Sequence, residues 1–76
     1  MTAPKKPSQP WRVKMITAGS ILESKYRSEP ATYRAVAAEK ERIANGASRV
    51  TRIRVEKWNV DYGRWEHFEP AYPEKP

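Results

Sequence analysis

Residues 28–46, SEPATYRAVAAEKERIANG, carry both the start and the stop signals of a single helix, and this segment constrains the fold most strongly. Ser28 can accept a hydrogen bond from the free amides of the first turn, and Pro30 is tolerated there. The alanine-rich middle has a high helix propensity. Asn45-Gly46 ends the segment, because glycine readily adopts the left-handed conformation. The sequence therefore predicts one helix of about four turns.

The predicted helix is amphipathic, so one side should pack against other elements. The side expected to face the core consists of Tyr33, Val36, Ala37, Lys40, Ile43 and Ala44, and Arg34, Glu39, Glu41 and Arg42 are expected on the other sides.

Alternating segments on both sides of the helix predict a sheet. Residues 11–16, WRVKMI, alternate as a strand, 17–20 can turn the chain, and 21–27 can return as a weaker strand. Residues 48–69 form a predicted hairpin that turns at residues 61–63, where Gly63 supplies a positive φ. We expect an α+β domain, a small antiparallel sheet of order ββαββ with one helix on one face. If the second strand does not form, βαββ remains.

The turn at 61–63 sets the register of this hairpin. With a three-residue loop, the facing pairs are Val60 with Arg64, Trp58 with Glu66, and Glu56 with Phe68. His67 is then expected opposite Lys57 on the helix side. A slip of one residue would turn every side chain to the other face.

Under this register the strands have an apolar face and a basic face. The apolar face is expected to hold Trp11, Val13, Met15, Leu22, Tyr26, Ile53, Val55 and Trp65. The other face is expected to hold Arg12, Lys14, Lys25, Arg27, Arg52, Arg54 and Arg64 with Glu23, Glu56 and Glu66, a net charge of +4. Trp58, Phe68, Ile16, Ile21, Val50 and Val60 lie among these charges. One helix covers one face only, so the basic face must meet water or a partner.

The basic face predicts a nucleic-acid-binding protein, with DNA favoured over RNA. Arginine and lysine contact phosphates, and aromatic rings stack on unpaired bases. The candidate binding residues are Arg12, Lys14, Arg52, Arg54, Trp58, Arg64 and Phe68. Two alternatives stay open. The same face suits a protein interface, including a homodimer, and a charged face can also be simply solvated.

Length and composition favour a single small domain. The 76 residues carry a net charge of +6 and no cysteine, which excludes disulfides and thiolate metal ligands. Proline-rich ends predict disordered tails at 1–10 and 70–76, around a domain at 11–69. No signal peptide or membrane span is recognisable, so we expect a cytoplasmic protein with no membrane partner.

Catalytic and cofactor motifs are not recognisable. His67 is the only histidine, and a metal site would need further ligands. The three glycines fit turns and a helix end, not a phosphate-binding loop. We therefore expect a protein that is not an enzyme and uses neither metal nor cofactor.

Two resemblances concern parts of the chain. The segments YRAVAAEKERIANGASRVTRIRVEKW and GRWEHFE resemble short basic proteins of high-GC actinobacteria and their phages. This resemblance implies an accessory protein of bacterial or phage origin that binds a host protein. KYRSEPA and GRWE resemble parts of the arm-site-binding domains of tyrosine recombinases, which read DNA with a sheet. Those domains place all strands before the helix, unlike the order expected here.

Overall fold

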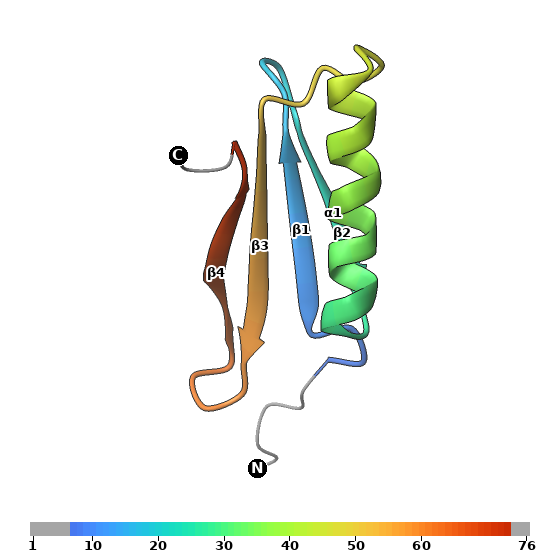
Figure 1. Cartoon of the computed structure of the whole chain (residues 1–76). Coiled ribbons are helices and arrows are strands. Elements are labelled where there is room, and N and C mark those ends of the chain that lie inside the picture. The colour runs from blue at the N-terminus through green and yellow to red at the C-terminus, as the bar shows by residue number, and fades with distance from the viewer. Residues whose placement is uncertain (1–6, 74–76) are drawn as a thin grey trace.

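The structure, a computed structural model, describes residues 7–73, which form one helix and four strands (Figure 1). The elements in chain order are β1 (Trp11–Ile16), β2 (Ile21–Tyr26), α1 (Glu29–Ala44), β3 (Arg52–Asn59) and β4 (Arg64–Tyr72). The predicted α+β fold of order ββαββ is confirmed, including its weaker second strand.

All neighbouring strands pair antiparallel, in the order β2-β1-β3-β4. The two hairpins lie side by side through β1 and β3, so β2 and β4 form the edges. Helix α1 runs along one side of the sheet, and β4 lies at the edge farther from it (Figure 1). The other side of the sheet has no covering element among residues 7–73.

The helix begins and ends where its capping residues predict. The Ser28 hydroxyl accepts the Ala31 N–H at 3.3 Å, which satisfies one of the free amides of the first turn. Asn45 caps the other end, and Gly46 follows with φ of 73°. Both predicted end signals are confirmed.

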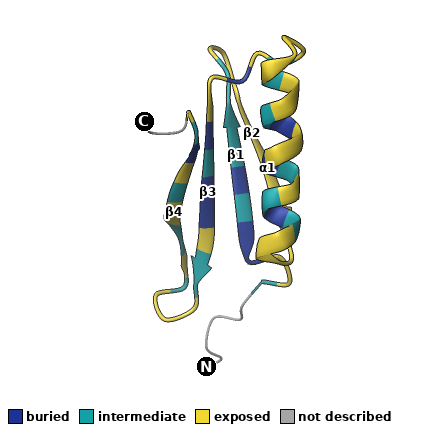
Figure 2. Ribbon diagram, in the orientation of Figure 1, coloured by how far each residue is buried: buried dark blue, intermediate teal, exposed yellow. Residues whose placement is uncertain are grey.

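The core lies between α1 and the two central strands. Val13, Ile53 and Val55 are completely buried, and Figure 2 shows buried residues along β1 and β3 but not along β2. The remaining buried apolar residues are Trp11, Val36, Val50 and Ala71. Two expectations were wrong here, because Val50 joins the core and Leu22 on edge strand β2 is 58% exposed.

The helix presents a slightly different side to the core than expected. Thr32, Val36 and Glu39 are its buried residues, whereas Ala37 is exposed. Glu39 is tolerated at this position because its carboxylate accepts the Ser48 hydroxyl and also lies near Arg42. The buried side of α1 thus includes the carboxylate of Glu39, held by Ser48 from the loop after the helix and by Arg42, although Glu39 was expected on another side of the helix.

The hairpin of β3 and β4 turns through four residues, so the predicted register is wrong by one. Gly63, with φ of 63°, donates its N–H to the Asn59 carbonyl at 2.8 Å, and the Asn59 side chain accepts the Tyr62 N–H at 3.1 Å. The observed pairs are Asn59 with Arg64, Trp58 with Trp65, Lys57 with Glu66, and Glu56 with His67. Trp65 therefore lies on the side away from α1, and Phe68 on the helix side.

Strand β4 extends beyond the predicted domain boundary at residue 69. Ala71 is buried in the core, and the Tyr33 hydroxyl donates to Glu69, which ties α1 to β4. Burial of Tyr33 and this carboxylate raise the pKa of its phenol above the usual range. Pro10 also belongs to the fold, since its carbonyl accepts the Trp58 N–H at 2.8 Å. Of the expected tails, residues 1–6 and 74–76 lie outside the described residues.

Replacing Ile53 tests this core. We expect Ile53→Ala to lower the free energy of unfolding by about 2–5 kcal/mol, because a fully buried side chain leaves a cavity. Urea unfolding followed by circular dichroism measures this change. Val60→Ala, at a loop residue that is 51% exposed, should change stability by less than about 0.5 kcal/mol. Equal effects of the two substitutions would contradict the placement of the core.

Candidate binding surface

The sheet face turned away from α1, here called the open face, is defined by strand pairing. Its side chains are Arg12, Lys14, Ile16, Ile21, Glu23, Lys25, Arg52, Arg54, Glu56, Trp58, Trp65 and His67. Five basic and two acidic residues give it a net charge of +3. The predicted value of +4 changes because Arg27 follows the end of β2 and because Arg64 and Glu66 lie on the helix side.

Trp65 lies across the open face and was wrongly expected in the core. The Arg12 guanidinium packs against its ring, 4.4 Å from the ring centroid, and the Lys25 ammonium lies 5.8 Å from it. Trp58 meets Trp65 edge-on, with centroids 5.5 Å apart and an interplanar angle of 77°. Cation–π and edge-to-face contacts of this kind stabilise a ring in a defined orientation. Two of the chain's three tryptophans are thus fixed on the face opposite the helix.

An ion-pair network occupies the middle of the open face. Glu56 is only 7% exposed; one of its oxygens accepts the Arg12 Nε–H at 2.7 Å and also lies 2.7 Å from Nη2 of the same guanidinium. The Lys14 ammonium lies 3.8 Å from the same oxygen and 3.6 Å from Glu23. Buried carboxylates need such partners, since a lone charge is costly to desolvate. Arg12 and Lys14 are therefore largely neutralised within the fold.

The other end of the open face carries cations without this compensation. Arg52 and Arg54 have no carboxylate partner within residues 7–73, and Arg54 contacts only the Nδ1 atom of His67, at 3.5 Å. Beside them lies a hollow of about 320 Å³. Its lining residues are Arg52, Arg54, Pro70, Tyr72 and Pro73. This part of the face combines positive charge, an aromatic ring and space for a ligand.

The structure brings together five of the seven candidate binding residues. Arg12, Lys14, Arg52, Arg54 and Trp58 share the open face. Phe68 does not, because it packs edge-on against Trp11 on the helix side, with ring centroids 5.0 Å apart. Arg64 lies at the hairpin end beside Tyr62 and Glu66.

Trp65 and His67 are the open-face residues that the predicted register missed. His67 pairs with Glu56 across β3 and β4, not with Lys57. The signal that identifies the correct register is Asn59, because asparagine favours the first position of a turn and can bond to the backbone amides that follow.

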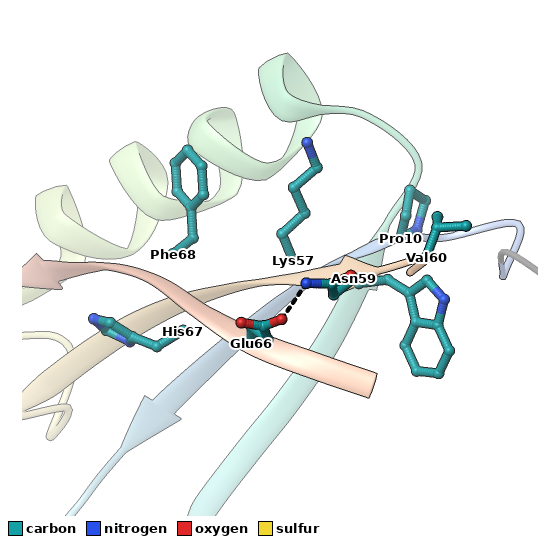
Figure 3. A pocket seen from close by; sticks show the side chains of 8 residues that line it. Pro10, Lys57, Asn59, Val60, Glu66, His67 and Phe68 are labelled. Atoms are coloured by element: carbon teal, nitrogen blue, oxygen red, sulfur yellow. Dashed lines mark hydrogen bonds between the residues drawn. The ribbon is translucent and has the colours of Figure 1, made fainter. Parts of the chain in front are cut away.

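A second hollow, of about 440 Å³, lies along the β3–β4 hairpin (Figure 3). In Figure 3 the side chains of Phe68 and Lys57 point toward α1, whereas the His67 ring points away from them. The Asn59 amide donates to Glu66 at this site. Phe68 remains 46% exposed, so this groove offers an apolar contact surface.

Two features are absent from residues 7–73, a cluster of metal-binding side chains and a membrane-spanning helix. Three or more histidine, cysteine, aspartate or glutamate side chains do not come together there in a way that would hold a metal ion. The helix of this region is too short and too polar to cross a membrane. Comparison of the chain with family models, curated proteins and solved structures found no match.

Breaking the ion pair beneath Trp65 tests the network. We expect Glu56→Ala to lower the free energy of unfolding by about 1–3 kcal/mol, because Arg12 is left without its buried partner. In a double-mutant cycle with Arg12→Ala, the coupling should reach about 1 kcal/mol or more. Urea unfolding of the four proteins measures it. If the two substitutions lower the free energy of unfolding additively, the network is contradicted. Glu41→Ala, on the exposed surface of the helix, is the control.

Proposed function

We propose that this protein is a small, non-catalytic binding protein that holds nucleic acid, DNA in the first place, on its open face. The observation that carries the proposal is the pair Arg52 and Arg54, which lacks carboxylate partners within residues 7–73 and borders a hollow. Guanidinium groups bind phosphate oxygens through several hydrogen bonds, and they stay charged at any physiological pH. The net charge of +6 adds long-range attraction for a polyanion.

In this proposal the two halves of the open face have different roles. Arg52 and Arg54 contact the phosphates at one end of the open face, and Lys25 adds a positive charge beside Trp65 at the other end. Trp58 and Trp65 supply aromatic surface on which unpaired bases stack. Arg12 contributes indirectly, because Glu56 and the Trp65 ring already hold its guanidinium. Lys14 is likewise occupied by Glu23 and Glu56.

Salt-dependent binding tests the proposal. Fluorescence anisotropy with labelled single-stranded and duplex DNA, between about 50 and 200 mM salt, should give affinities that fall steeply as salt rises. Arg52→Ala and Arg54→Ala should each weaken binding and reduce the slope of log K against log salt by about 0.7–0.9, the loss of one phosphate contact.

Arg64→Ala is the matched control, since it removes the same charge from the helix side of the hairpin. It should leave that slope unchanged, because this side chain makes no phosphate contact in the proposed complex. Equal losses for Arg64 and Arg54 would mean that net charge alone drives binding. A protein that binds neither DNA at the lowest salt would overturn the proposed function.

A second candidate function is a protein-interaction module, which the groove in Figure 3 favours. Exposed apolar residues gather at that end of the hairpin: Val60 is 51% exposed, Tyr62 72% and Phe68 46%. Partly exposed aromatic residues at a groove are typical anchors of protein interfaces. The resemblance to actinobacterial and phage proteins would make the partner a bacterial host protein. The two candidate functions differ in the residues that they require. Protein binding requires Phe68 and Val60, whereas nucleic-acid binding requires Arg52 and Arg54.

A further inference from the structure

The two edge strands of the sheet differ in how well they are protected from pairing with another strand. Strand β4 has register irregularities at two places, and its Pro70 lacks an N–H group. Bulges and proline are common devices that prevent edge-to-edge association. Strand β2 has neither, since it pairs with β1 residue for residue from Ile21 to Tyr26.

Strand β2 is also unusually exposed. Five of its six residues are exposed, and Ile21 and Leu22 each keep 58% of their surface in water. A regular edge strand with exposed apolar side chains is a template for another strand. Figure 2 shows β2 coloured as exposed along most of its length, and in the strand order β2-β1-β3-β4 no other strand among residues 7–73 pairs with its outer edge.

The hairpin fixes which backbone groups point outward. Thr17 donates its N–H to the Ser20 carbonyl at 2.9 Å, so these two residues form a hydrogen-bonded pair. Such pairs alternate along antiparallel strands. Leu22, Ser24 and Tyr26 therefore turn their backbone groups toward β1, whereas Ile21, Glu23 and Lys25 turn theirs to the open edge.

These three outward residues make the edge self-complementary in one register. If a two-fold axis passes at Ser24, Glu23 lies opposite Lys25 of a second copy, and Lys25 lies opposite its Glu23. An axis at Glu23 or at Lys25 would instead oppose like charges, which destabilises a cross-strand pair. An axis nearer Ile21 would shorten the paired segment. The register at Ser24 also sets Leu22 against Tyr26 of the second copy on the helix side.

We propose that the chain forms a symmetric dimer in which β2 pairs antiparallel with β2 of a second copy, with the axis at Ser24. The dimer joins the two sheets into one and makes the two open faces continuous.

The backbone pairing uses the outer edge of β2. The Glu23 and Lys25 side chains lie on the open face, but their pairing with a second copy does not require nucleic acid. A second copy pairs the outward backbone groups of β2 and sets Leu22 against Tyr26. It also adds a lysine to Glu23, whose carboxylate lies 3.6 Å from the Lys14 ammonium of its own chain.

Charge reversal tests the pairing through a measurement of mass. Sedimentation equilibrium of nuclease-treated wild-type protein should show a mass approaching twice the 8.8 kDa of one chain as concentration rises. Lys25→Glu and Glu23→Lys should each weaken self-association roughly tenfold, because both charge pairs across the two β2 strands become repulsive. Mixing the two variants should restore wild-type affinity, since the two carboxylates of one variant then face the two ammonium groups of the other.

The double swap within one chain, Glu23→Lys with Lys25→Glu, should also dimerise. It guards against a folding defect in either single variant, and circular dichroism checks that all of them are folded. Arg64→Glu replaces a positive by a negative charge, as Lys25→Glu does, but on the other hairpin. This control should dimerise like wild type. A single-chain mass for wild type up to about 1 mM would overturn the dimer, a weak one included. A mixture that associates no better than its components would overturn the register.

Discussion

The turn from Asn59 to Gly63 determines what the open face contains. Its four-residue loop, held by the Asn59 side chain and the positive φ of Gly63, places Trp58 opposite Trp65. A loop shorter by one residue would turn Trp65 to the helix and Phe68 to the open side. The aromatic pair, the cation–π contact with Arg12 and the exposure of Phe68 all depend on this one choice of register.

On one half of the open face the side chains pack against and pair with one another. On the other half the arginines lack carboxylate partners within residues 7–73. Glu56, Arg12 and Trp65 satisfy one another, so that half stabilises the sheet where no helix covers it. Arg52 and Arg54 gain no comparable partner within residues 7–73. A marginally stable small domain can thus use one part of a basic face for its own stability and keep another part available for an anion.

The sequence predicts the elements well because their signals are local. Ser28, Asn45-Gly46 and the alternation of residues 11–16 and 52–55 each specify a helix end or a strand. The faces of β4 depend on loop length and on two later register shifts, which are set by pairing across the sheet. Composition suggests the basic face. Which arginines are neutralised follows only from distances, since Arg12 and Arg54 look alike in the sequence.

In the proposed function, nucleic acid binds at Arg52 and Arg54 on the open face and not along the helix-side groove. NMR tests this most directly, by following the chemical shifts of the backbone amides and the tryptophan indole N–H groups while isotope-labelled protein is titrated with single-stranded DNA. The expected shifts cluster at Arg52, Arg54 and the Trp65 indole, with Phe68 unchanged. Shifts centred on Phe68 and Val60, or none in any residue at low salt, would contradict it.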